Sequence, residues 1–202
     1  MSNTIVLKLY AACEWISETA LLTLCWLLFT ILGLGIFGFM PATGALFAVS
    51  RKKILKEPVP VFQTFFAAYK KDFLSMNLWG LALGGTASFM LLNFNILYAH
   101  AAEFPMAMAV PFLIGLLLFG CFLVNFFPVF CHFQLKPAAY LKHTVMVSLL
   151  QPMKSLLMLG WVLAVGLLSL IFPFLIPFFT MGAVAHGLNY LALKGYKKMA
   201  SA

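Results

Sequence analysis

Long apolar runs separated by short polar segments dominate the pattern of the chain. A membrane-spanning helix needs about 20 predominantly apolar residues. The runs predict spanning helices at about residues 18–38, 76–98, 107–131, 147–172 and 176–193. The pattern therefore predicts an all-α fold, a polytopic membrane helix bundle that forms a single transmembrane domain over residues 1–202.

The first apolar run continues beyond the length of one crossing. It reaches Val49 and contains three glycines before Pro41. Because glycine and proline interrupt helices, we expect a break near residues 38–41 and a separate short helix over residues 42–55. Pro41 and Thr43 would then start that helix, where a proline costs no hydrogen bond and a threonine hydroxyl reaches free backbone groups.

An amphipathic segment follows the short helix. Its aromatic side chains recur at helical spacing, at Phe62, Phe65, Phe66, Tyr69 and Phe73. Lys70 and Lys71 lie away from that aromatic face. We expect a helix over residues 60–74 that either lies in the plane of the membrane interface or packs on neighbouring protein. Residues 42–74 would then form a cytoplasmic and interfacial segment with one or two interfacial helices.

The composition excludes several classes of protein. Hydrophobic residues make up 64% of the 202 residues and charged residues 9%, whereas a soluble domain is about 45–50% apolar and about 25% charged. Soluble, disordered and nucleic-acid-binding proteins are therefore excluded, although the net charge is +8. The basic residues instead mark the orientation of the chain in the lipid bilayer.

With five crossings, nearly all basic residues fall on one side of the membrane. These are Arg51, Lys52, Lys53, Lys56, Lys70, Lys71, Lys136, Lys142, Lys194, Lys197 and Lys198, with Lys154 toward the same side. The other side receives Lys8. Basic residues concentrate on the cytoplasmic side of membrane proteins. We therefore expect the amino terminus outside and the carboxyl terminus in the cytoplasm.

The sequence offers little for catalysis or metal binding. Its five acidic residues lie outside the expected crossings or at their edges, and it contains no phosphate-binding loop, nucleophile elbow or H-E-x-x-H motif. The four cysteines form no C-x-x-C pair, and the histidines cannot share one site, because His100 falls on the outer side and His132 and His143 on the inner side. We expect no catalytic residues, no cofactor and no metal, so the protein is not expected to be an enzyme.

Polar side chains inside the crossings are the remaining candidates. His186 and Asn189 lie one turn apart in the fifth crossing, and Asn93, Asn95 and Asn125 lie in the second and third. Such groups, with Gln151 near the fourth crossing, either join helices by hydrogen bonds or line a polar cavity. The first alternative predicts a dry core, and the second predicts a path for a solute.

The stretch FGFMPATGALFAVSRKK at residues 37–53 resembles the YesL-like family of bacterial membrane proteins. The matching residues are Pro41, Ala42, Thr43, Ala45, Leu46, Phe47, Val49, Arg51 and Lys52, whereas Met40 stands where the family commonly has glycine. The runs LCWLLF at 24–29 and FQTFFAAYKKDF at 62–73 are also similar to family segments. The resemblance implies a bacterial cytoplasmic membrane and an association with ATP-driven carbohydrate importers, within a family that has no assigned function.

Two functions remain open at this point. The first is a non-enzymatic accessory subunit of a carbohydrate ABC importer, with Pro41, Thr43, Arg51 and Lys52 as candidate contacts to a partner or ligand. Alternatively, Pro41 and Thr43 only form a well-made corner. The second function is a small-solute carrier or channel. Its candidate polar contacts are Asn93, Asn125, His186 and Asn189. The pattern is also compatible with a homo-oligomer.

Overall fold

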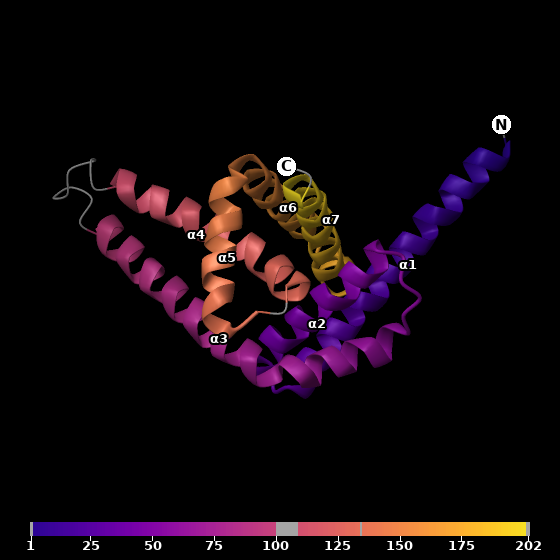
Figure 1. Ribbon diagram of the computed structural model, residues 1–202, viewed down its shortest axis with the longest axis horizontal. Helices are drawn as coiled ribbons and strands as arrows, with labels where there is room; N and C mark the ends of the chain where they lie inside the picture. Colours follow the sequence, from indigo (N-terminus) through magenta and orange to yellow (C-terminus); the bar gives the residue numbers. More distant parts are fainter. Residues whose placement is uncertain (1, 100–108, 134, 201–202) are drawn as a thin grey trace.

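The computed structural model describes residues 2–99, 109–133 and 135–200, and most of these residues lie in helices. They are α1 (Ser2–Leu32), α2 (Ile36–Ile54), α3 (Val61–Ala99), α4 (Ala109–His132), α5 (Pro137–Leu150), α6 (Pro152–Ile171), the π-helical turn η2 (Ile176–Thr180) and α7 (Met181–Ala200). In Figure 1 their colours follow the chain from indigo at the amino terminus to yellow at the carboxyl terminus. No strand occurs in the described ranges, which confirms the predicted all-α helix bundle.

Within the described ranges, five segments are long and apolar enough to cross a membrane. They are Cys13–Leu32, Val61–Ala99, Val110–His132, Pro152–Ile171 and Ile176–Lys197. The prediction of a multi-pass membrane protein is therefore confirmed. Large apolar side chains stay exposed on the outer faces of these helices, such as Leu163, Leu167 and Leu170 on α6. An apolar exterior is what contact with lipid tails requires.

The predicted break near residues 38–41 is wrong. Helix α1 ends at Leu32 and α2 begins at Ile36, so the chain turns earlier. The turn needs positive φ at two successive residues, 59° at Leu34 and 73° at Gly35. Pro41 is an interior residue of α2 rather than its start. The physical reason is that the glycine-rich turn reverses the chain before the proline is reached.

Helices α1 and α2 form an antiparallel hairpin. A Cβ atom added to Gly33 would collide with the Cα atom of Gly38, so the two backbones touch at the turn. At the other end, Lys53 of α2 forms an ion pair with Glu18 of α1, with Nζ and Oε1 2.5 Å apart. The basic end of α2 therefore lies beside the first part of the α1 crossing.

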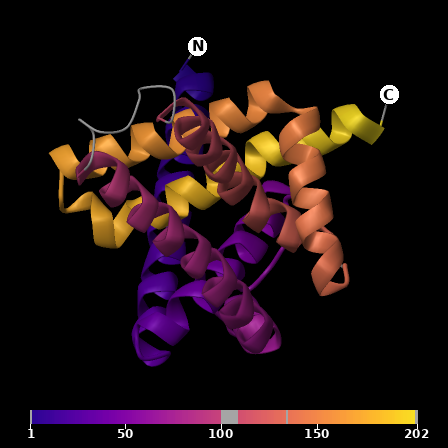
Figure 2. The same cartoon turned by 90° about the vertical axis from the view of Figure 1, so that its left-hand side faces the viewer.

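Helix α2 is the centre of the fold. It touches α1, α3, α4 and α7, and ten of its 19 residues are buried. Leu46 and Val49 are completely enclosed, and the Phe47 ring stacks on Phe127 of α4 with centroids 5.1 Å apart. Figure 2 shows the hairpin of α1 and α2 beside α3 and α4, with α6 and α7 running across it.

The amphipathic segment is not a separate helix, as the sequence led us to expect. It is the first part of α3, which continues for 39 residues into the second crossing. Phe65 is completely buried against Phe29 of α1, with ring centroids 5.1 Å apart. Tyr69 also contacts the Phe29 ring, whereas Lys70 is exposed. Part of the aromatic face therefore packs on protein, whereas Phe62 and Phe66 stay more than half exposed.

The sequence analysis did not predict helix α5 and expected only a fourth crossing from residue 147. The structure instead has a 14-residue helix that begins at Pro137, and a new helix that begins at Pro152. Proline fits the first turn of a helix but not its interior. Pro152 therefore divides one apolar run into a short helix and a 20-residue crossing.

Candidate functional site

Two buried amides join helices that are distant in the sequence. Asn125 Nδ2 donates to Cys121 O in its own helix α4 at 2.8 Å and to Ser155 Oγ in α6 at 2.9 Å. Asn189 Nδ2 of α7 donates to Phe47 O of α2 at 2.9 Å. Both amides are almost inaccessible, at 3% and 2% exposure. Both act as hydrogen-bonded links between helices.

Asn93 and Asn95 behave differently. Each donates to the carbonyl oxygen four residues earlier in α3, at 2.7 Å and 2.8 Å. Within the described part of the chain, neither side chain hydrogen-bonds to another helix, so the expectation that they join helices is not met there. An asparagine can satisfy its own helix in this way when no partner helix is near.

His186 and Gln151 each contact a different helix. The His186 ring meets the Trp15 ring of α1 edge to face, with centroids 5.8 Å apart. Gln151, between α5 and α6, donates from Nε2 to Gly195 O of α7 at 3.3 Å. The candidate intramembrane side chains therefore occupy different helix contacts and do not surround one common cavity.

Pro41 and Thr43 lie inside the protein. Pro41 is fully buried, and Thr43 is only 7% exposed. Thr43 Oγ1 donates to Phe39 O at 2.7 Å and accepts a hydrogen bond from Trp26 Nε1 of α1 at 3.0 Å. These contacts hold the hairpin together and leave neither residue on a surface that a partner could reach. Their role in the hairpin agrees with the alternative of a well-made corner, and a partner contact at these two positions stays a prediction.

A close crossing of α1 and α7 was not identified from the sequence. The Gly182 N–H donates to Thr23 Oγ1 at 3.0 Å, and this hydroxyl donates to Thr19 O at 2.9 Å. Both threonines are buried. The only signal in the sequence is the spacing of four between two small hydroxyl residues, which places them on one helix face.

The basic residues gather where several helix ends meet. Arg51 Nη1, near the end of α2, donates to Cys131 O near the end of α4 at 3.3 Å. The His132 ring lies against the Tyr196 ring of α7, with centroids 4.7 Å apart. The start of α6 reaches the same end through Gln151. We call this region the basic end.

A cavity of about 350 Å³ opens at the basic end between α2, α3, α4 and α5. Arg51 and Lys52 line it from α2, Lys71 and Asp72 from α3, and Tyr140 from α5. Arg51 and Lys52 were candidates from the sequence. Lys71 and Asp72 were not, because only the antiparallel packing of α3 on α2 brings the two segments together. We call this space the basic cavity.

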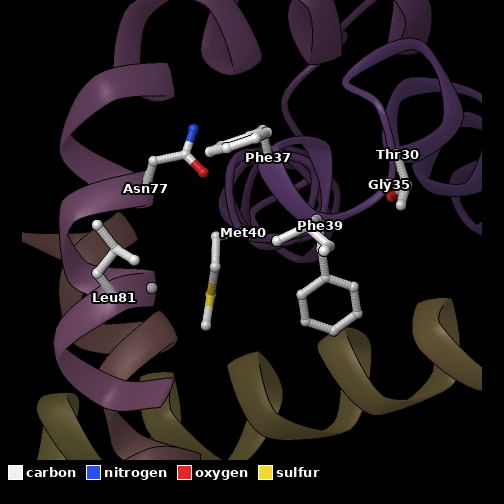
Figure 3. A pocket seen from close by; sticks show the side chains of 9 residues that line it. Thr30, Gly35, Phe37, Phe39, Met40, Asn77 and Leu81 are labelled. Atoms are coloured by element: carbon white, nitrogen blue, oxygen red, sulfur yellow. The ribbon is translucent and has the colours of Figure 1, made fainter. Parts of the chain in front are cut away.

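An apolar pocket of about 620 Å³ lies near the opposite end of α2, beside the hairpin turn. Figure 3 shows Met40 between Leu81 and Phe39, with Asn77 pointing toward Phe37. The Asn77 amide already donates to a carbonyl of its own helix at 2.9 Å. The pocket therefore presents mainly apolar surface and offers little polar recognition.

The described residues contain no group of three or more histidine, cysteine, aspartate or glutamate side chains that could hold a metal ion. The basic cavity instead brings three cationic side chains and one carboxylate together. Their arrangement suits binding of a charged group rather than metal coordination.

Comparison with known proteins identifies the family. The family described as "Protein of unknown function, DUF624" matches residues 19–94, which include the second part of α1, all of α2 and most of α3. Three uncharacterized proteins of Bacillus subtilis (strain 168) are similar over most of the chain. YteU is 36% identical over 176 residues, 86% of this chain and 78% of its own length. YesV is 34% identical over 202 residues, 98% and 96% of the two chains.

YesL is 31% identical over 189 residues, which cover 93% of this chain and 88% of its own. No solved structure matches the chain. The resemblance carried by Pro41, Arg51 and the residues between them is thus confirmed over nearly the whole length. The chain belongs to the DUF624 family of YesL-like membrane proteins.

Proposed function

We propose that this protein is a non-enzymatic accessory subunit in the bacterial cytoplasmic membrane, associated with an ATP-driven carbohydrate importer. The importer association follows from what the family resemblance implies. The observation that carries the subunit role is the asymmetry of the fold. The buried amides of Asn125 and Asn189 form hydrogen bonds between helices, whereas Arg51, Lys52 and Lys71 share one cavity at the basic end.

This asymmetry counts against an independent carrier. A carrier needs polar groups that face a water-filled path through the membrane. Here Asn125 and Asn189 are buried and bonded to partner helices, and His186 packs against an aromatic ring. These three polar side chains therefore stabilise the bundle, and we assign recognition of a partner to the basic end.

The basic end faces the cytoplasm in this proposal. Arg51, Lys52 and Lys71 line one cavity there, and contacts at His132 and Gln151 bring the ends of α4, α6 and α7 to the same region. Concentration of basic residues on one side is the strongest general indicator of the cytoplasmic side. The carboxyl-terminal end of α7 then also lies on the cytoplasmic side.

The position of the amino terminus depends on whether α2 crosses the membrane. The expectation of an outside amino terminus assumed that only α1 crosses. With 19 residues and a rise of about 1.5 Å per residue, α2 is about 28 Å long, close to the hydrocarbon thickness of about 30 Å. The Glu18–Lys53 ion pair at 2.5 Å supports a full hairpin of two crossings.

We therefore favour six crossings, with both termini in the cytoplasm. Lys8 then also joins the basic side, so the charge bias becomes stronger. A cysteine at position 36 tests this directly, because Ile36 is 85% exposed beside the hairpin turn. In a protein whose exposed Cys13 is replaced by serine, a membrane-impermeant thiol reagent should label Ile36→Cys from outside the cell. Labelling from the cytoplasmic side alone would restore the five-crossing topology and the outside amino terminus.

Co-purification tests the subunit role. The tagged protein is extracted from its native host in mild detergent, and co-purifying importer chains are identified by mass spectrometry. Lys70→Glu and Lys142→Glu reverse exposed charges outside the basic cavity and should reduce recovery of the partner. Lys70→Arg and Lys142→Arg preserve the charge and should retain it.

The proposal fails if no importer chain co-purifies, or if the glutamate and arginine variants recover it equally. Solute uptake by reconstituted vesicles that contain this protein alone would instead favour the carrier. In that case Asn125→Leu should abolish uptake, because it removes the most enclosed polar contact between α4 and α6.

A further inference from the structure

The basic cavity combines an excess of positive charge with restricted access to water. Arg51, Lys52 and Lys71 outnumber Asp72, the acidic residue among those that line it. The ion pair found in the described part of the chain joins Lys53 to Glu18, outside the cavity. No cation of the cavity forms an ion pair with a carboxylate within the described residues. The Asp72 carboxylate interacts electrostatically with Lys71, but three cations face this one carboxylate, so positive charge remains available to a ligand.

Among the cations of the basic cavity, Arg51 is the best placed to bind an anion. Its Nη1 donates to Cys131 O at 3.3 Å, whereas its Nε is buried and has no hydrogen-bond partner in the described structure. A buried donor that lacks an acceptor costs free energy. The planar guanidinium presents its N–H groups as a fork that fits two oxygen atoms of a phosphate or carboxylate.

The uncharged side chains that line the cavity are either short or held in place by other contacts. Ala48 and Ala68 contribute short side chains that leave space beside Arg51. Tyr140 stacks on Phe130 with centroids 4.7 Å apart. The Tyr140 hydroxyl donates to a backbone carbonyl at 3.0 Å and accepts a backbone N–H at 3.1 Å. This wall is therefore fixed by the protein itself, and the charged side chains are the ones available to a ligand.

We propose that the basic cavity binds a phosphate group, carried either by an anionic lipid headgroup or by a soluble phosphate compound. The three cations and one carboxylate that line it leave a net charge that opposes a phosphate charge of about −1 to −2. Basic pockets between helices on the cytoplasmic side bind lipid headgroups by this chemistry. Asp72 repels the same anion and thereby limits its affinity. The proposal does not depend on the association with an importer.

Lipid retention tests the first source. The protein is reconstituted in phosphatidylcholine bilayers with a minority of phosphatidylglycerol, and lipids that remain bound in detergent are identified by native mass spectrometry. Arg51→Gln should reduce the retained phosphatidylglycerol about tenfold, because a hydrogen bond to a charged group is lost. Lys71→Gln, at an exposed position of the cavity, should also reduce it, and Asp72→Asn should increase it.

The matched control is Lys56→Gln, which removes one charge beyond the end of α2 and outside the cavity. It should leave the retained lipid within about twofold of the wild type. The second source is tested with inorganic phosphate, which should raise the unfolding temperature in phosphatidylcholine alone if the ligand is soluble. The shift should be lost in Arg51→Gln and Lys71→Gln.

Dependence on Arg51 and Lys71 in either measurement supports the site and identifies its source. Equal loss of lipid in Lys56→Gln and Lys71→Gln would mean general attraction to anionic headgroups and would overturn the proposal. Absence of both phosphatidylglycerol retention and a phosphate shift would overturn it as well. Lys71→Gln keeps the test valid if Arg51→Gln fails to fold, because Lys71 is exposed and makes no hydrogen bond within the described chain.

Discussion

Gly182→Ala should separate two helices that cross closely, α1 and α7. The glycine backbone lies directly on α1, where its N–H donates to Thr23 Oγ1 at 3.0 Å. A Cβ atom at this position would lie 2.5 Å from Thr19 O and 2.8 Å from Thr23 Oγ1. The first of these atoms belongs to the backbone and has no side-chain rotamer to change. The helices must therefore move apart by about 1 Å to restore ordinary contact.

The cost has two parts. Overpacking of a close contact costs about 1–3 kcal/mol, and loss of a hydrogen bond between membrane helices costs about 0.6–2 kcal/mol. Alanine recovers up to about 1 kcal/mol because it favours the helix more than glycine does. We expect a net loss of about 2–3 kcal/mol in the free energy of unfolding, which lowers the unfolding temperature by about 5–10 °C.

Buried cysteines provide the assay. Cys25 and Cys121 are buried and free, so a fluorogenic thiol reagent reports unfolding in detergent as these side chains become accessible. Gly84→Ala is the matched control, because no atom lies within 4 Å of the position of its Cβ. It should unfold at or slightly above the wild-type temperature. If Gly182→Ala unfolds at the temperature of Gly84→Ala, the close crossing of α1 and α7 is refuted.

Two further contacts give predictions with the same assay. Asn189→Leu removes the bond to Phe47 O and should cost about 1–2 kcal/mol, whereas Asn95→Leu removes only a bond within α3 and should cost less than about 0.5 kcal/mol. Equal losses would contradict the linking role of Asn189. Lys53→Glu should destabilise the hairpin because it opposes two carboxylates, and Glu18→Lys in the same chain should restore stability. Failure of the double variant to recover would contradict the ion pair.

The crossings follow from the sequence because the membrane imposes a local rule. Each must be about 20 apolar residues long, whatever packs beside it. The third crossing was expected at about residues 107–131 and is found at Val110–His132. The fifth was expected at about residues 176–193 and is found at Ile176–Lys197. The all-α class follows for the same reason, since a helix satisfies its own backbone in lipid.

The two prolines illustrate where this local rule ends. Pro41 was expected to start a helix and lies inside one, whereas Pro152 does start a helix and was expected inside a crossing. The chain breaks before Pro41 instead, at the turn through Leu34 and Gly35 with its positive φ angles. Glycine and proline allow a helix to end at several positions in this run. The helix ends where the backbones of α1 and α2 can pack, at Gly33 and Gly38.

The candidate site was decided by tertiary structure. Arg51 was recognised from its motif, but its carbonyl partner at Cys131 lies 80 residues away, and Asn189 reaches Phe47 across 142 residues. Asn95 has the same chemistry as Asn189, yet it bonds only within its own helix. Sequence alone identified five segments that are apolar enough to enter the membrane, because burial in lipid depends on each segment separately. Tertiary structure decided which polar groups bind one another and which form the basic cavity, because those contacts depend on how the helices pack.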